Sequence, residues 1–165
     1  MQEYMKEHIT IYTDGSCLGN PGRGGYGFIL RYKEHYKEGY GGFLLTTNNR
    51  MELIGVIRAL TMIRSRIDII LYTDSKYIRN AIEEGWLQKW QRSGWKTSTK
   101  KSVKNRDLWE HLYSLLTTYT VRFEWVKAHN GNTYNERCDI LAKQGAQMEN
   151  QERDIVFEES IHNKT

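Results

Sequence analysis

Four acidic residues of this chain have the types and positions that a site for divalent metal ions needs. Asp14 lies in the run IYTDGS, Glu52 in NNRMELIG, Asp74 in LYTDSKYI and Asp139 in NERCDILA. Carboxylates gathered at one place repel one another, so they need positive charge nearby, and Mg2+ is the usual partner of clustered oxygen ligands. Such a cluster suits hydrolysis of a phosphodiester by two metal ions. The residues therefore predict a metal-dependent nuclease site.

Each carboxylate also has a purely structural interpretation. Asp14 could mark a turn and Asp74 could cap a helix. Glu52 could close a capping box with Asn49, and Asp139 could lie on an exposed helix face. The joint pattern favours the metal site, because TDGS and YTDS both end strand-like runs. If those strands are parallel neighbours, Asp14 and Asp74 leave the sheet side by side, and a helix that begins near Asn49 can present Glu52 to them.

The elements that must position these residues can be read from the hydrophobic pattern. Strand-like runs cover residues 8–14, 24–32, 36–45, 67–74 and 121–126, and helical spacing covers residues 48–63, 75–85, 107–119 and 135–147. Short loops join the first three strands, which predicts an antiparallel meander. The later alternation of strands and helices predicts an α/β fold with a mixed sheet and helices packed on its faces.

Composition is that of a soluble globular protein. The chain has 165 residues, of which 39% are hydrophobic and 27% charged, and it is expected to form one domain. No apolar run approaches the ~20 residues that cross a bilayer, so we expect no membrane association. Its two cysteines, Cys17 and Cys138, are too few for a disulfide framework, which favours a reduced, cytoplasmic location.

The net charge of +4 is unevenly spread. Residues 146–165 carry five acidic and two basic side chains, a charge of −3, so the rest of the chain carries +7. A basic body points to a polyanionic partner, although ordinary solubility charge explains it equally well. Beyond residue 147 we expect a loosely held acidic tail, in which Ile155, Val156 and Phe157 could dock locally.

Residues 86–106 combine basic and aromatic side chains. The segment contains no acidic residue, has tryptophans at 86, 90 and 95, and carries seven cations: Lys89, Arg92, Lys96, Lys100, Lys101, Lys104 and Arg106. Cations neutralise phosphates, and aromatic faces pack on sugars or bases. The alternative is a solvated basic face whose tryptophans belong to the core.

Five blocks of the sequence together resemble the bacterial type 1 ribonuclease H family, which cuts the RNA strand of RNA/DNA hybrids. They are YTDGSCLGNPGRGGYG, TTNNRMEL, LYTDSKYI, GWKTSTKKSVKNRDLW and VKAHNGNTYNERCDILA, in family order over residues 8–145. The resemblance implies a five-stranded mixed sheet of order 3-2-1-4-5. It also implies one catalytic domain over residues 1–147, with a basic protrusion at about 86–106 and a tail at 148–165. Arg23, Lys76 and Ser102 depart from the commonest pattern.

The resemblance also implies roles for individual residues. Asp14, Glu52, Asp74 and Asp139 match the family's ligands for two Mg2+ ions, for which Mn2+ could substitute, and His129 matches a histidine that moves protons or aids product release. The implied substrate contacts are Cys17, Asn20, Asn48 and Asn49 in the minor groove; Thr47, Arg50 and Asn105 near a DNA-phosphate pocket; Trp86, Trp90 and Lys96 in the protrusion; and Lys76 and Asn135.

The expected activity is therefore endonucleolytic hydrolysis of the RNA strand of a hybrid, leaving 5′-phosphate and 3′-hydroxyl ends. Two alternatives remain open at this point. One is a DNA-cutting integrase or junction resolvase on the same fold, and the other is a non-catalytic module that binds hybrids. The expected partner is an RNA/DNA hybrid, and a monomer is the default for a domain of this size. The sequence leaves open whether the activity serves primer removal, R-loop clearance or a mobile element.

Overall fold

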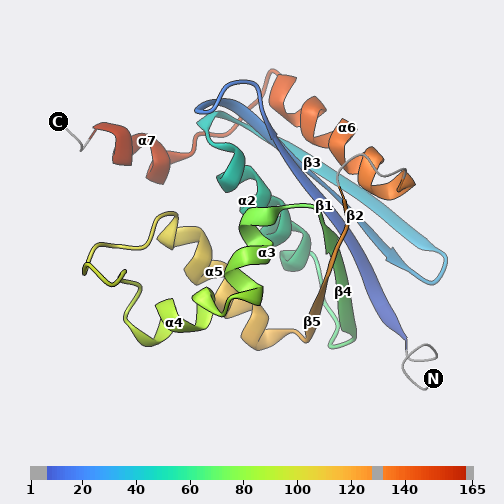
Figure 1. The fold of residues 1–165 in the computed structure, drawn as a ribbon. Coiled ribbons are helices and arrows are strands. Elements are labelled where there is room, and N and C mark those ends of the chain that lie inside the picture. Colours follow the sequence, from blue (N-terminus) through green and yellow to red (C-terminus); the bar gives the residue numbers. More distant parts are fainter. Residues whose placement is uncertain (1–6, 128–131, 163–165) are drawn as a thin grey trace.

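The sheet has the predicted order. A computed structural model describes residues 7–127 and 132–162. β1 (His8–Cys17), β2 (Gly22–Tyr32) and β3 (His35–Thr46) form the antiparallel meander, and β4 (Asp68–Thr73) and β5 (Val121–Trp125) continue the sheet in parallel with β1. The strand order β3-β2-β1-β4-β5 confirms the α/β prediction (Figure 1).

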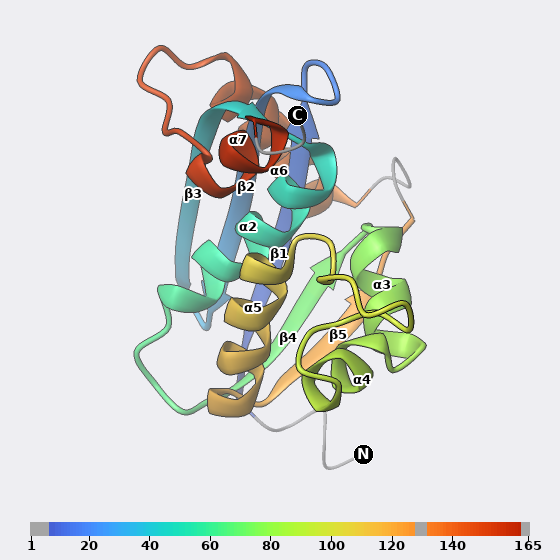
Figure 2. The ribbon, with the colours of Figure 1, turned by 90° about the vertical axis from the view of Figure 1, so that its left-hand side faces the viewer.

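Helices cover the two faces of this sheet unequally. They are α2 (Asn48–Thr61), α3 (Lys76–Glu83), α4 (Trp86–Arg92), α5 (Arg106–Thr118), α6 (Thr133–Gln147) and α7 (Ile155–His162). α2 lies on one face with α5 beside it, whereas α6 packs on the opposite face over β1, β2 and β3 (Figures 1 and 2). No helix within the described ranges has the length and apolarity to cross a membrane.

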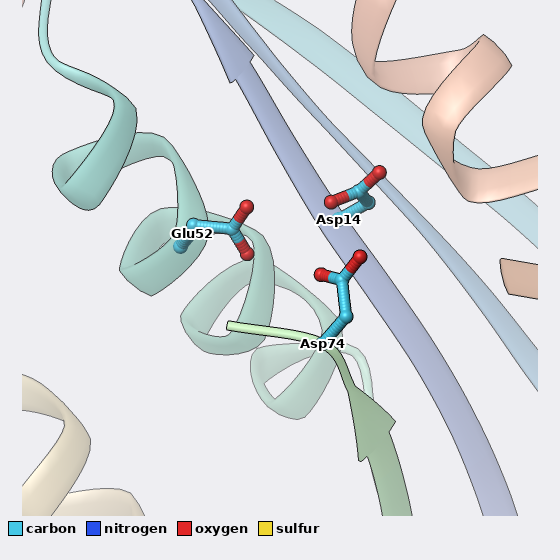
Figure 3. Close-up of side chains that lie close together, drawn as sticks. All are labelled: Asp14, Glu52 and Asp74. Atoms are coloured by element: carbon cyan, nitrogen blue, oxygen red, sulfur yellow. The ribbon is translucent and has the colours of Figure 1, made fainter. Parts of the chain in front are cut away.

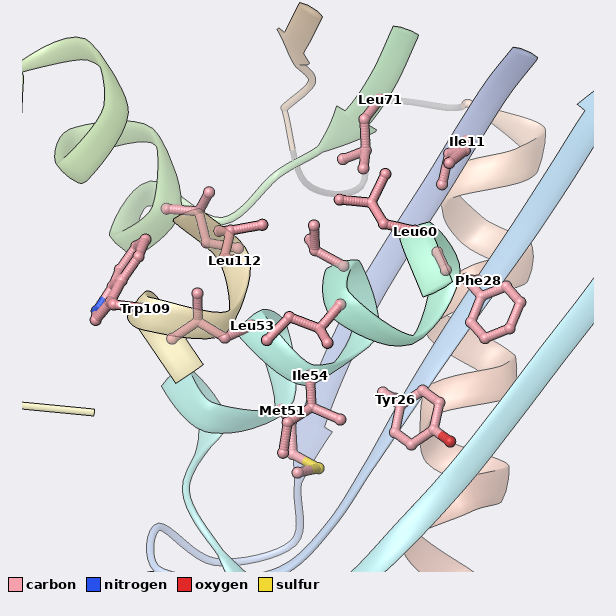
Figure 4. Close-up of a cluster of buried hydrophobic side chains, with 14 of the residues drawn as sticks. Ile11, Tyr26, Phe28, Met51, Leu53, Ile54, Leu60, Leu71, Trp109 and Leu112 are labelled. Atoms are coloured by element: carbon pink, nitrogen blue, oxygen red, sulfur yellow. The ribbon is translucent and has the colours of Figure 1, made fainter. Parts of the chain in front are cut away.

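The main core lies between the sheet and the α2–α5 layer. Alternation along β1 turns Ile9 and Ile11 toward this layer, and Ile69 and Leu71 do the same on β4. Many residues of α2 are buried, and Trp109 of α5 is completely buried against them (Figure 4). This core fixes α2 over the sheet, and α2 carries one of the predicted metal ligands.

On the other face, α6 approaches the strands closely because glycines meet there. A Cβ on Gly42 would lie 1.9 Å from the carbonyl oxygen of Gly145, and one on Gly25 would lie 2.1 Å from that of Ala142. Real Cβ atoms do not come so close to backbone oxygens, so only glycine permits this contact. The close approach sets the position of α6, which carries Asp139.

The C-terminal segment differs from the loosely held tail that we expected. Glu152 pairs with the edge of β3: its N–H donates to the Gly42 carbonyl and its own carbonyl accepts from the Leu44 N–H, both at 2.9 Å. Asp154 is buried. Arg23, one of the departures from the family pattern, donates to the Met148 carbonyl at 2.8 Å. The segment thus covers a sheet edge through backbone and ionic contacts. Such contacts produce no hydrophobic periodicity, so the sequence gives no sign of them.

Candidate active site

Two of the predicted ligands lie side by side on neighbouring parallel strands, Asp14 within β1 and Asp74 just after the end of β4. The register of β1 with β4 ends at the pair Tyr12 and Tyr72, and Asp14 and Asp74 each follow two residues later. Asp14 is still within β1, where it pairs with β2, so its backbone is held firmly. Ser75, and not Asp74, caps α3, because the hydroxyl of Ser75 accepts from the Ile78 N–H at 3.2 Å.

Glu52 reaches the same place from α2. The N-cap of α2 is Thr47, whose hydroxyl accepts from the Arg50 N–H at 3.2 Å. The alternative capping box between Asn49 and Glu52 is therefore wrong, since the helix begins earlier. Glu52 lies one turn inside the helix and points across to Asp14 and Asp74 (Figure 3).

These three carboxylates form a compact cluster. One oxygen from each of Asp14, Glu52 and Asp74 lies within 4.8 Å of the others. The Gly15 N–H donates to Glu52 Oε1 at 3.2 Å, but the buried Oε2 of Glu52 has no hydrogen-bond partner among the described residues. A buried carboxylate oxygen without a partner is costly. The structure therefore brings together three predicted ligands and leaves one of their oxygens in need of a donor or a cation.

Burial and mutual repulsion change the protonation of the cluster. Burial, reinforced by the charge of Asp74, raises the pKa of Asp14 to about 8. Burial, together with repulsion from Asp14 and Asp74, raises the pKa of Glu52 well above its ordinary value. Without a cation, Asp14 therefore holds a proton at neutral pH. A divalent cation would replace it, and hard oxygen ligands of this kind fit Mg2+ or a similar ion.

Asp139 lies at the rim of the cluster. It lines the same cleft as the other three carboxylates, but Asp139 Oδ2 forms an ion pair with Lys143 Nζ at 2.9 Å. Its side chain is 30% exposed, whereas Asp14 and Glu52 are buried. Asp139 is thus near enough to take part in the site, but it is not one of the three clustered ligands.

The cluster lies in a cleft of about 380 Å³. Four predicted substrate-binding residues line this cleft with the carboxylates: Asn48, Asn49, Lys76 and Asn135. Asn20 lies next to it, because its Oδ1 accepts from the Asn48 N–H at 3.1 Å. Cys17 Sγ contacts the Thr46 carbonyl oxygen at 3.6 Å, one residue before the N-cap of α2.

Sequence reasoning missed Tyr77 as a residue of this cleft. Tyr77 stands on the first turn of α3, three residues after Asp74, and lines the cleft with the carboxylates. Its hydroxyl accepts from Asn105 Nδ2 and from Trp109 Nε1, both at 3.0 Å. A polar aromatic residue in the first turn after a strand-end carboxylate was the available signal.

The remaining predicted contacts lie farther from the carboxylates. Trp86 is 41% exposed, whereas Trp90 packs on Trp109 with ring centroids 5.4 Å apart. Lys96 is exposed in the segment between α4 and α5. His129 lies outside the described residues. Trp90, predicted as a substrate contact, is thus partly buried against the core, and Trp86 is the tryptophan of this segment that offers an exposed face.

Comparisons with known proteins agree with this geometry. A family model described as RNase H matches residues 6–147. The chain is 56% identical over 135 residues to a ribonuclease H of Nitratidesulfovibrio vulgaris strain Hildenborough, which covers 82% of this chain and 86% of that protein. Among solved structures, the chain is similar to LC9-RNase H1, which is described as a type 1 RNase H with the type 2 active-site motif. The TM-score is 0.75 at 30% sequence identity, and the match covers 86% of this chain and 72% of that one. The fold also matches LC11-RNase H1, solved in complex with an RNA/DNA hybrid, with a TM-score of 0.64, 21% identity, and coverage of 84% and 96%.

Proposed function

Because this chain belongs to the ribonuclease H family, it is a metal-dependent nuclease, and we propose that it cuts the RNA strand of RNA/DNA hybrids endonucleolytically, leaving 5′-phosphate and 3′-hydroxyl ends. The observation that carries this proposal is the cluster of Asp14, Glu52 and Asp74 from three elements at one sheet edge. We assign the activity to one domain over residues 1–147.

The residues of the cluster fit a pair of Mg2+ ions. Asp14, Glu52 and Asp74 would hold them, with Asp139 available from the rim of the cleft. When bound, the ions supply Lewis acidity, which favours ionisation of the attacking water and offsets negative charge on the leaving 3′ oxygen. The unpartnered Glu52 Oε2 supports this assignment, because a cation would give that buried oxygen a partner.

Amide side chains in the cleft suit recognition of the RNA strand. Distinguishing RNA from DNA requires a contact with the 2′-hydroxyl group, which both donates and accepts hydrogen bonds. Asn48, Asn49 and Asn135 offer both functions beside the carboxylates. We propose that Cys17, Asn20, Asn48 and Asn49 contact the minor groove, and that Lys76, which lines the cleft, contacts the substrate.

The basic protrusion at residues 86–106 is the second part of the proposed substrate site. Its exposed cations would neutralise phosphates of the DNA strand, and Trp86 offers an exposed aromatic face. We propose that the cleft and the protrusion together bind one hybrid duplex. The monomeric state, the cytoplasmic location and a role for His129 stay predictions.

A substrate panel tests this function directly. Labelled RNA/DNA, RNA/RNA and DNA/DNA duplexes of one sequence, and a DNA duplex with a single ribonucleotide, would be offered with Mg2+ and with excess chelator. We expect metal-dependent cleavage of the RNA strand in the RNA/DNA hybrid alone. Cleavage of DNA/DNA would favour a DNA-cutting enzyme of the same fold. Tight hybrid binding without cleavage by folded protein would favour the non-catalytic module.

A further inference from the structure

The guanidinium group of Arg50 uses all of its donors inside the protein. Arg50 is 3% exposed. Its Nε and Nη2 donate to Asp154 at 2.7 and 3.0 Å, its Nη1 and Nη2 donate to Asp107 at 2.9 and 2.7 Å, and its Nη1 donates to Asn105 Oδ1 at 3.3 Å. A guanidinium has five N–H donors and no acceptor. No donor is therefore left to bind a phosphate, so Arg50 can affect substrate binding only through the residues that it contacts.

This arrangement fixes the amide of Asn105. Because Arg50 can only donate, the Asn105 atom that faces it must be the oxygen, and Nδ2 must then face Tyr77. Tyr77 takes one N–H of Nδ2, and no described residue takes the other. The Tyr77 hydroxyl accepts from both Asn105 and Trp109, so its own proton is directed elsewhere. Asn105 thus has one N–H and Tyr77 one O–H left to donate, and of the two Tyr77 lines the catalytic cleft while Asn105 lies behind it, within hydrogen-bond distance of its hydroxyl.

Asp154 is the member of this network that comes from the C-terminal segment. The Thr46 hydroxyl donates to Asp154 Oδ2 at 2.7 Å, and the Phe157 N–H donates to Oδ1 at 3.4 Å. The pairing of Glu152 with β3 anchors the chain just before it. Figure 2 shows α7, which follows Asp154, beside the first turns of α2. The backbone hydrogen bonds of this segment therefore hold the Asp154 carboxylate in place beside Arg50.

We propose that Asp154 is a positioning residue for substrate binding. Acting through Arg50, it orients the Asn105 amide and the Tyr77 hydroxyl so that both donate to a backbone phosphate of the bound hybrid. Without the Asp154 charge, Arg50 is held more weakly on that side and can turn toward other oxygens, and the Asn105 amide is no longer held in one orientation. The inference rests on the proposed function, because it concerns how the same substrate is held.

The first test compares Asp154→Asn with Glu152→Gln in the full chain. Glu152 belongs to the same segment, but its carboxylate pairs with Arg58 at an exposed site, away from Arg50. The probe is a labelled RNA/DNA hybrid, with Kd measured by anisotropy in chelator and with KM and kcat measured in Mg2+. For Asp154→Asn we expect Kd and KM to rise about three- to tenfold, the effect of weakening one or two hydrogen bonds to phosphate, with kcat nearly unchanged. Glu152→Gln should match the wild type.

A double-mutant cycle separates positioning from general loosening. Both variants are assayed at a temperature where urea denaturation shows that they are fully folded. In an Asn105→Ala background, Asp154→Asn should have little further effect on Kd, because the amide through which it acts is absent. The same fold loss in both backgrounds, an unchanged Kd, or a fall in kcat alone would overturn the inference. Failure of the wild type to cleave the hybrid would instead overturn the proposed function.

Discussion

Asp14 and Glu52 accept hydrogen bonds from the same backbone N–H group. The N–H of Gly15 lies 2.9 Å from Asp14 Oδ1 and 3.2 Å from Glu52 Oε1, and so links β1 to α2 within the carboxylate cluster. One neutral donor offsets little of the repulsion between two buried carboxylates. The shared hydrogen bond therefore sets their geometry and leaves most of their charge for a cation to balance.

Replacing the clustered carboxylates should stop the chemistry without unfolding the protein. Asp14→Asn and Asp74→Asn keep the side-chain shape but remove the charge that holds metal ions, so we expect turnover to fall by at least about a hundredfold. Steady-state cleavage of a hybrid measures this, with circular dichroism as the folding check. Glu124→Gln is the matched control, because Glu124 is a carboxylate on the neighbouring strand β5 that pairs with Arg122. Near-normal turnover by both Asn variants would refute the assignment.

The metal-free protein should lose stability as the pH rises. The pKa of Asp14 is raised from 3.8 to about 8, so between these values the folded protein holds a proton that the unfolded chain has released. The free energy of unfolding therefore falls through this range. Urea denaturation in chelator from about pH 5 to about pH 9 would measure the slope. Saturating Mg2+ or the Asp14→Asn substitution should flatten it, and a wild-type slope that neither changes would contradict the raised pKa.

Gly15 is expected to tolerate no side chain. A Cβ at this position would lie 2.6 Å from the backbone nitrogen of Glu52, so strand and helix would have to move apart. Gly15→Ala should therefore weaken Mg2+ binding and lower kcat, because Glu52 is carried away from Asp14. Isothermal titration with Mg2+ and cleavage assays would show both effects. Gly94→Ala is a useful control, since a Cβ at Gly94 has no atom within 4 Å, although its positive φ of 70° adds some strain.

The basic protrusion should control the salt dependence of binding. Lys96, Lys100 and Lys101 are all exposed, and replacing them together by Ala removes cations that lie outside the cleft and would neutralise phosphates. The slope of log K against log salt should flatten by up to about 0.9 for each phosphate that is no longer neutralised, with kcat preserved. Replacing Lys37, Arg64 and Arg66, three exposed cations outside the protrusion, controls for net charge. Equal slopes for the two triple variants would remove the protrusion from the binding surface.

Arg50 should contribute far more to stability than a surface arginine. It is buried between Asp107 and Asp154. Burial alone would lower the pKa of Arg50, but its hydrogen bonds to these two carboxylates outweigh that effect and raise the pKa. Arg50→Ala leaves buried charge unpaired and should cost about 3–5 kcal/mol in the free energy of unfolding. Arg79→Ala breaks only an exposed pair with Glu83 and should cost less than about 1 kcal/mol. Urea denaturation of the two variants decides between these values.

The strands, most of the helices and the position of the cluster can be read from the amino-acid sequence alone. Alternating apolar residues mark β4 and the first part of β1, and Asp74 and Asp14 come at the end of these apolar runs, so they could be placed at one edge although β1 itself continues to Cys17. The spacing of α2 then put Glu52 on a helix over that edge. These inferences need only local periodicity and the rule that parallel strands end at the same side of a sheet.

The contacts that hold the surrounding groups could not be read from the sequence. Arg50 meets Asp154 across 104 positions of the chain, and no local pattern marks that pair. The folded structure also shows that the C-terminal segment covers the edge of β3 and that Tyr77 lines the cleft. It places Asp139 at the rim of the cleft, paired with Lys143. Hydrogen bonds and ion pairs between distant segments depend on where backbones meet in space, whereas hydrophobic periodicity reports only which face of each element is buried.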